Sequence, residues 1–155
     1  MVWNQFPKKL LKHATVEYIP IEVHHTATFR LSTGMESSEP AIYPCCSRDD
    51  LRQVIARTVA VARASSTEAS ALNDTVSAMR FDFDRNVVIV AVGLDIQSSA
   101  AYRAYDNILV ATRAPDTISV YYHRKTIFYK ASVVFKAYSA DGADGEILAQ
   151  STLNL

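Results

Sequence analysis

The feature that most constrains the fold is a change of hydrophobic period near residue 85. Before it, Leu51, Val54 and Ile55 begin an apolar stripe with helical spacing, and a second stripe follows Ser65. After it, apolar residues run together or alternate with polar ones, as they do in strands. Short links between strands favour antiparallel pairing. We therefore expect an α+β fold, in which a curled antiparallel β-sheet of about five to six strands packs against a central helical segment.

The C-terminal hairpin is the most detailed prediction. Residues 126–138 alternate, with the odd-numbered positions expected to face the core, and residues 147–155 alternate again. Between them, Asp141-Gly142 and Asp144-Gly145 supply residues that accept positive φ, which hairpin turns require. The pattern predicts two antiparallel strands joined across these Asp-Gly pairs.

The N-terminal third predicts a short helix and then a strand. Pro7 suits the first turn of the helix. Residues 17–31 alternate, which indicates one half-buried strand or two strands in one register. Pro20 has no N–H to donate, so the strand is expected to lie at a sheet edge there.

The middle of the chain carries a helix start and a central strand. Ser47 followed by Asp50 resembles a capping box, so a helix is expected after Ser47. Residues 48–80 form either one bent helix or two. The continuous apolar run at residues 87–94 predicts a strand covered on both faces, and residues 97–101 indicate a polar break after it. Two further strands are expected, one at residues 105–111 and one at residues 118–122.

Length and charge limit the class of protein. A chain of 155 residues suits a single domain spanning residues 1–155. Its 16 Lys and Arg residues balance 16 Asp and Glu residues, which argues against a nucleic-acid or anionic-membrane partner. No apolar run is long enough to span a membrane and no secretory signal is visible, so we predict a cytoplasmic protein.

The reactive residue types offer weak candidates. Cys45 and Cys46 precede a helix N-terminus, where a thiol becomes nucleophilic if a histidine serves as base. Acidic residues in the first helical turn oppose this, and core filling is the favoured interpretation. His24 and His25 are neighbours on a strand and point to opposite faces, so they cannot chelate one metal together; His25 falls on the apolar face.

One pair of carboxylates is a further candidate for a catalytic or metal site, and the common catalytic and nucleotide-binding motifs are absent. Asp82 and Asp84 share a face if their segment is extended, but alternation with phenylalanine favours a solvated strand face. The chain contains no G-x-G-x-x-G, P-loop, G-x-S-x-G or H-E-x-x-H motif. We therefore predict no catalytic residues, no metal, no nucleotide and no other cofactor.

One stretch mixes aromatic and basic residues and is the candidate interaction surface. Such a mixture suits stacking of bases, a protein interface, or a hairpin whose aromatics fill a core while its lysines protect an edge. The residues are Tyr121, Tyr122, His123, Arg124, Lys125, Lys130 and Lys136.

Three functions remain after this search. The leading hypothesis is a non-enzymatic structural or assembly subunit that acts through protein–protein interaction, as a homo-oligomer or docked in a larger complex. The first alternative is a hotdog-like acyl-thioester hydrolase or acyl-binding protein that uses Asp49 or Asp50 at the helix N-terminus. The second alternative is a nucleic-acid-binding module that uses the aromatic-basic hairpin.

Overall fold

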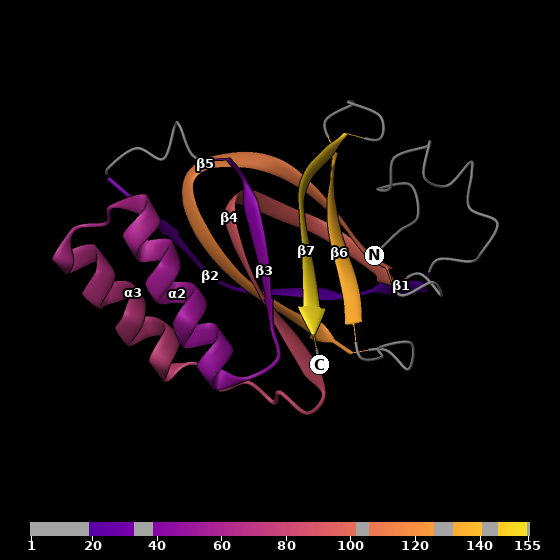
Figure 1. Ribbon diagram of the computed structural model, residues 1–155, viewed down its shortest axis with the longest axis horizontal. Coiled ribbons are helices and arrows are strands. Elements are labelled where there is room, and N and C mark those ends of the chain that lie inside the picture. Colours follow the sequence, from indigo (N-terminus) through magenta and orange to yellow (C-terminus); the bar gives the residue numbers. More distant parts are fainter. Residues whose placement is uncertain (1–18, 33–38, 102–105, 126–131, 141–145, 155) are drawn as a thin grey trace.

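The computed structural model describes residues 19–32, 39–101, 106–125, 132–140 and 146–154, with residues 101 and 106 as backbone only. Within these ranges two helices pack against one mostly antiparallel sheet (Figure 1). The α+β fold predicted from the hydrophobic pattern is confirmed, with seven strands rather than five or six. In chain order the elements are β1 (Ile19–Ile21), β2 (Val23–Arg30), β3 (Ala41–Cys45), α2 (Arg48–Ala62), α3 (Ser66–Ala78), β4 (Asn86–Ala101), β5 (Asp106–Arg124), β6 (Ser132–Ser139) and β7 (Ile147–Asn154).

The helical segment consists of two helices, each with its own cap. Ser47 caps α2 by accepting a hydrogen bond from the backbone N–H of Asp50, as predicted. Arg63, with φ 52°, ends this helix in the left-handed conformation, and the chain turns. Ser65 and Glu68 then form a reciprocal capping box that starts α3. Two separate sets of end signals explain why the segment is two helices.

A long hairpin of β4 and β5 organises the sheet and bends at its middle. Val92 pairs with Ile118, but Leu94 pairs with Arg113, so residues 114–117 of β5 have no partner in β4. Gly93 sits at this bend with φ 70°, a conformation that favours glycine. The bend divides the molecule into two half-sheets. The first half-sheet contains residues 86–92 of β4 and 118–124 of β5, flanked by β3 and β2.

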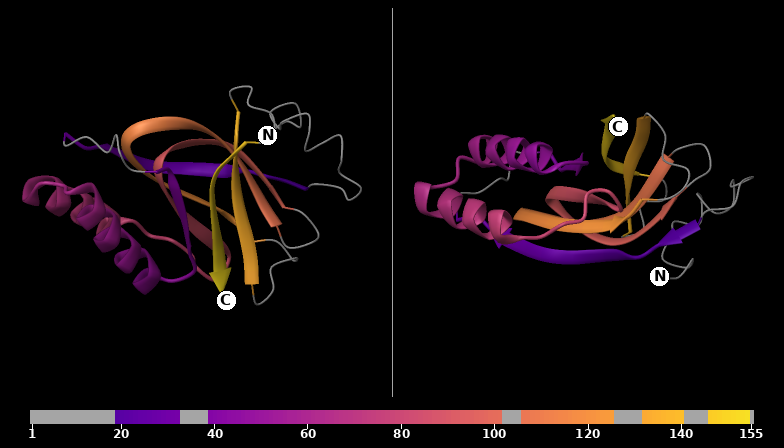
Figure 2. Two further views of the ribbon diagram at one scale, coloured as in Figure 1. Left: turned by 45° about the horizontal axis from the view of Figure 1, so that its top comes forward. Right: turned by 90° about the horizontal axis from the view of Figure 1, so that it is seen from below.

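The second half-sheet contains the remaining halves of β4 and β5. β1 pairs with β4 on one side, and β6 followed by β7 continues from β5 on the other. The bend brings β7 beside β3, although these two strands are not paired (Figure 1). The helices and the β6–β7 hairpin cover different parts of the sheet, and β2 lies at the outside (Figure 2).

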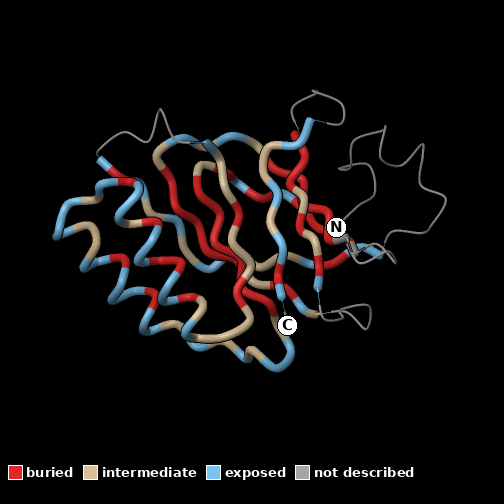
Figure 3. The backbone as a smooth tube through the Cα atoms, in the orientation of Figure 1, coloured by how far each residue is buried: buried red, intermediate tan, exposed pale blue. Residues whose placement is uncertain are grey.

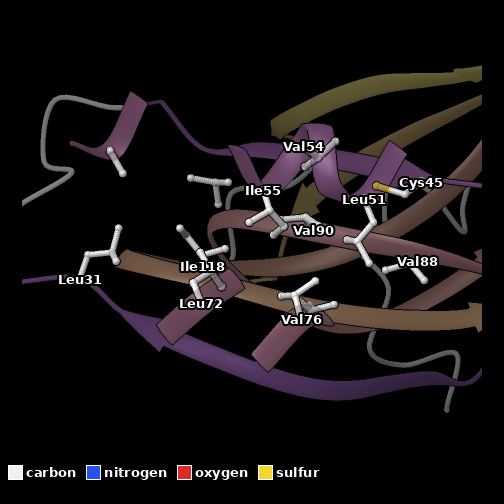
Figure 4. Close-up of a cluster of buried hydrophobic side chains, with 13 residues drawn as sticks. Leu31, Cys45, Leu51, Val54, Ile55, Leu72, Val76, Val88, Val90 and Ile118 are labelled. Atoms are coloured by element: carbon white, nitrogen blue, oxygen red, sulfur yellow. The ribbon is translucent and has the colours of Figure 1, made fainter. Parts of the chain in front are cut away.

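Two apolar clusters fill the molecule, one on each face of β4. The helix-side core lies between the helices and the first half-sheet (Figure 4). Its buried members are Leu31, Cys45, Leu51, Val54, Ile55, Ala62, Leu72, Val76, Val88, Val90, Val92, Ile118 and Val120. The bend core lies between the two half-sheets and contains Ile42, Val87, Ile89, Ala91, Leu94, Ile96, Leu109, Ala111, Tyr121, Val133, Phe135, Ala137 and Leu153. The prediction that residues 87–94 are covered on both faces is confirmed, and the buried backbone concentrates there (Figure 3).

The N-terminal alternation corresponds to two strands with different partners. Among the described strands β1 pairs only with β4, so Pro20 lies in an edge strand as expected. β2 pairs with β5 and is bulged between His25 and Ala27. Because the bulge adds one residue, Val23 packs against the bend core while Phe29 packs against the helix-side core. The expected single register is therefore wrong. The helix predicted around Pro7 lies outside the described residues.

Two expectations about the second half of the chain need correction. Residues 97–101 are not a break: Ser98 and Ser99 are buried and β4 continues to Ala101, because its backbone pairs with β5. β5 is one bent strand where the sequence suggested two. It also pairs with β6 in parallel, since the bend lets the chain return along the first part of β5.

The C-terminal hairpin is confirmed where the structure describes it. β6 and β7 pair antiparallel, from Ser132 opposite Asn154 to Tyr138 opposite Ile147. The odd positions Val133, Phe135 and Ala137 are buried, as their alternation predicts. The two Asp-Gly pairs lie outside the described residues. In the described part of the chain, neither helix is long and apolar enough to cross a membrane.

Candidate functional site

The aromatic-basic stretch is distributed over both faces of β5. Tyr121 and His123 point into the bend core and are buried. Tyr122 faces the helix side, where it is half-buried. Arg124 is exposed, and Lys125 is half-buried with its Nζ donating to the carbonyl of Phe83 at 2.8 Å. Alternation along a strand separates neighbours in this way.

The remaining members of the predicted surface are on other segments. Lys136 is half-buried on β6, opposite Gln150 of β7. Lys130 lies outside the described residues. Of the seven residues, the structure brings Arg124 and Lys125 together at the rim of one groove, described below. The use of all seven as an interaction surface stays a prediction.

The adjacent cysteines are held in unreactive surroundings. Burial is the main cause that raises the pKa of the Cys45 thiol to about 12. The Cys46 Sγ lies 3.0 Å from Asp50 Oδ2, and this hydrogen bond raises the thiol pKa. The same bond chiefly holds the pKa of Asp50 below its usual value. Neither thiol has the low pKa of a nucleophile at a helix N-terminus, and the Asp50 carboxylate already accepts hydrogen bonds from Cys46.

The two neighbouring histidines and the two nearby aspartates each contact residues close to them. His24 stacks on Tyr122, with ring centroids 4.8 Å apart. His25, which the sequence placed on the apolar face, is exposed, and its ring lies edge-on to that of Tyr121 with centroids 5.3 Å apart. Asp82 and Asp84 lie in the turn before β4 rather than in a strand, and both are exposed. Asp82 there pairs with Arg85 at 3.7 Å.

Hydrogen-bonded side chains lie beside the bend, next to β2. His25 Nε2 lies 2.6 Å from Thr28 Oγ1, which lies 2.8 Å from Ser119 Oγ. Tyr121 of the first half-sheet donates to Asp95 Oδ1 of the second at 3.0 Å. Burial is the main cause that raises the pKa of Tyr121 to about 12, so its hydroxyl stays protonated at neutral pH. The bond between Tyr121 and Asp95 links the two half-sheets and therefore has a structural role.

His123 is the one buried histidine of the described residues. Its Nδ1 lies 3.2 Å from the carbonyl of Arg124, whereas its Nε2 has no hydrogen-bond partner in the described part of the chain. Its ring centroid is 6.1 Å from that of Phe135 across the bend core. Burial is the main cause that lowers the pKa of His123 to about 4. The imidazole is therefore neutral at physiological pH.

A groove of about 440 Å³ lies near the start of β2, at the ends of the two half-sheets that are away from the bend. One wall is β1, which the second half-sheet holds through Ser99 to Ala101. The opposite side comes from the first half-sheet, where Asn86 pairs with Arg124. The described residues that line it are Ile19–Ile21, Glu22, His24, Asn86, Arg124 and Lys125. Its size falls within the range of small-molecule sites.

The sequence pattern does not predict most of the residues that line this groove. Arg124 and Lys125 were singled out for their aromatic neighbours, which point elsewhere. The groove residues come from segments about a hundred positions apart, and no motif spacing links them. Ile19 is the large aliphatic side chain of the lining that is exposed, but exposure cannot be read from a sequence.

The described residues contain no cluster of three or more metal-ligating side chains. No protein-family model, no curated protein and no solved structure matches the chain.

Proposed function

We propose that the protein is a non-enzymatic assembly subunit that self-associates through the outer edge of β2. The observation that carries this proposal is that β2, with eight residues, pairs with β5 on one side and with no described strand on the other. Alternate backbone N–H and C=O groups of such an edge point away from the sheet and can pair with another chain.

The other edges are less suited to strand addition. β1 has three residues and includes Pro20, which lacks an N–H donor. β3 and β7 lie beside one another, so each limits approach to the other. Among the described strands, β2 is therefore the most accessible edge.

The order of charges along β2 favours a second copy as the partner. In an antiparallel pair with a two-fold axis at Thr26, Glu22 of one copy would lie opposite Arg30 of the other. Glu22 and Arg30 are both exposed, and no ion pair to Arg30 is present among the described residues. Opposite charges would therefore meet at both ends of the shared edge, where such cross-strand pairs stabilise the pairing.

The bulge at Thr26 adds selectivity to this pairing. A bulge twists an edge strand and disfavours addition of an arbitrary strand. A second β2 carries the same bulge, and a two-fold axis through Thr26 would set the two bulges against each other. A closed dimer with one shared interface follows from such an axis.

Charge reversal tests this interface. Arg30→Glu would place like charges at both ends of the paired strands, and we expect the dimer dissociation constant to rise about tenfold. Glu22→Arg should have a similar effect, and the double variant should restore association. Sedimentation equilibrium measures the dimer dissociation constant of the wild type, the two single variants and the double variant.

Arg52→Glu on α2 is the matched control, because the Arg52 side chain is exposed and its ion-pair partner among the described residues is Asp49 of the same helix. It should leave association unchanged. A wild-type chain that stays monomeric at high concentration, or a double variant as weak as the single ones, would refute the proposal.

A further inference from the structure

We propose that the groove lined by β1, the first residue of β4 and the last residue of β5 binds a small amphipathic anion. The oxyanion head of this ligand would lie at Arg124 and Lys125, and its apolar body would lie against β1. This site is separate from the proposed β2 pairing, although Glu22 borders both.

The head-group position follows from the cationic side chains. Arg124 is exposed, and its guanidinium makes no hydrogen bond or ion pair with a described residue. A guanidinium presents paired N–H donors that match the two oxygens of a carboxylate, sulfonate or phosphate. Lys125 lines the same groove, and its ammonium keeps donors beyond the one used on the carbonyl of Phe83.

The charge balance of the lining favours an anion over a cation. Arg124 and Lys125 contribute two positive charges, whereas Glu22 contributes one negative charge. The carboxylate of Glu22 lies 4.0 Å from His24 Nε2 and its side chain is 79% exposed, so solvent screens it. The described residues that line the groove thus carry a net positive charge, in a chain whose formal net charge is +0.

The apolar body is suggested by the wall that β1 forms. Ile19 is 38% exposed and is one of three large apolar residues exposed among the described ones. Pro20, the next residue of β1, is also exposed, whereas Ile21 is buried. Covering the Ile19 side chain with an aliphatic or aromatic group would remove apolar surface from water. A ligand with only a charged head would leave this wall bare.

Two matched probes test both halves of the proposal. 1-Anilinonaphthalene-8-sulfonate carries a sulfonate on an aromatic body, and N-phenyl-1-naphthylamine has the same body without the charge. Fluorescence titration of the native chain should give one saturable site for the sulfonate. Arg124→Gln should weaken sulfonate binding about tenfold, as expected for loss of a charge-assisted hydrogen bond, and should change binding of the neutral probe less than about twofold.

Further variants test the contact with the anionic head and the contact with the apolar body separately. Ile19→Ser should weaken both probes, and Glu22→Gln should strengthen the sulfonate alone. Arg52→Gln on α2 should change neither. Arg30→Glu should leave binding of the neutral probe unchanged, which keeps the apolar part of this site distinct from the β2 interface. Circular dichroism establishes that each variant is folded. Absence of a saturable site, or equal sulfonate affinity for wild type and Arg124→Gln, would overturn the proposal.

Discussion

The two faces of β4 are buried in different ways. The helix-side core is covered by α2 and α3, which follow β3 directly in the chain. The bend core is covered by strands that reach it only because β4 and β5 fold back on themselves. Val88 and Val90 belong to the first cluster, and Val87 and Ile89, one residue away, belong to the second.

The difference lies in the polar groups that each cluster tolerates. The helix-side core is built from aliphatic side chains, a thiol and well-capped helices. The bend core includes Tyr121 and borders His123, whose Nε2 has no partner among the described residues. A buried polar atom without a hydrogen bond reduces stability. The bend therefore brings the two half-sheets together, and it also buries polar side chains between them.

The largest expected effect compares the two clusters by truncation. Phe135 and Leu51 are both 0% exposed, in the bend core and the helix-side core respectively. Phe135→Ala should lower the free energy of unfolding by about 3–5 kcal/mol, and Leu51→Ala by about 2–5 kcal/mol. Urea unfolding measures both. A loss below about 1 kcal/mol for Phe135→Ala would mean that the half-sheets are not tightly packed.

The second prediction sharpens the comparison through pH. Because the pKa of His123 is about 4 in the folded protein and its ordinary value is 6.5, the unfolded chain binds more protons between these values. Stability should therefore fall as the pH drops from about 6.5 towards 4, by up to about 3 kcal/mol from this residue.

His123→Leu should remove this part of the pH dependence. Urea unfolding at several pH values, compared with wild type, isolates it from the carboxylates that titrate at lower pH. Leu51→Ala is the control and should keep the wild-type slope, because Leu51 is a buried residue that carries no titratable group. Equal slopes for His123→Leu and wild type would contradict a buried neutral imidazole.

The smallest effect concerns the bend itself. Gly93 has φ 70°, and a Cβ added there would meet Pro40 Cα at 3.8 Å, an ordinary contact. The cost of Gly93→Ala is therefore conformational, about 1–2 kcal/mol. Gly93→Asn should cost less, because asparagine adopts this conformation more readily. Thermal unfolding compares the two, and a larger loss for asparagine would argue against backbone strain at this position.

The sequence predicts the structure correctly where the interacting residues are close together in the chain. Ser47 and Asp50 marked the start of α2, and the odd positions of β6 were assigned to the core. The register of β2 was misread, because one bulge residue at Thr26 reverses which side chains face the helices. The break expected at residues 97–101 was also wrong, since serines remain in a strand when neighbouring strands pair with their backbone.

The candidate site depended on long-range geometry in the same way. The sequence singled out Arg124 and Lys125 but grouped them with Tyr121 and His123, which the strand turns into the bend core. Glu22 and Ile19 became relevant only when β1 was placed against the far end of β4.

The sequence by itself determined the α+β class, the capped helical segment, the central strand and the C-terminal hairpin. Each depends on side-chain periods and end signals within a few residues. Only the tertiary structure decided the bend at Gly93, the parallel pairing of β5 with β6, the open edge of β2 and the groove beside Arg124. Those features arise from contacts between distant segments, and a period of two or 3.6 residues carries no information about which distant segments meet.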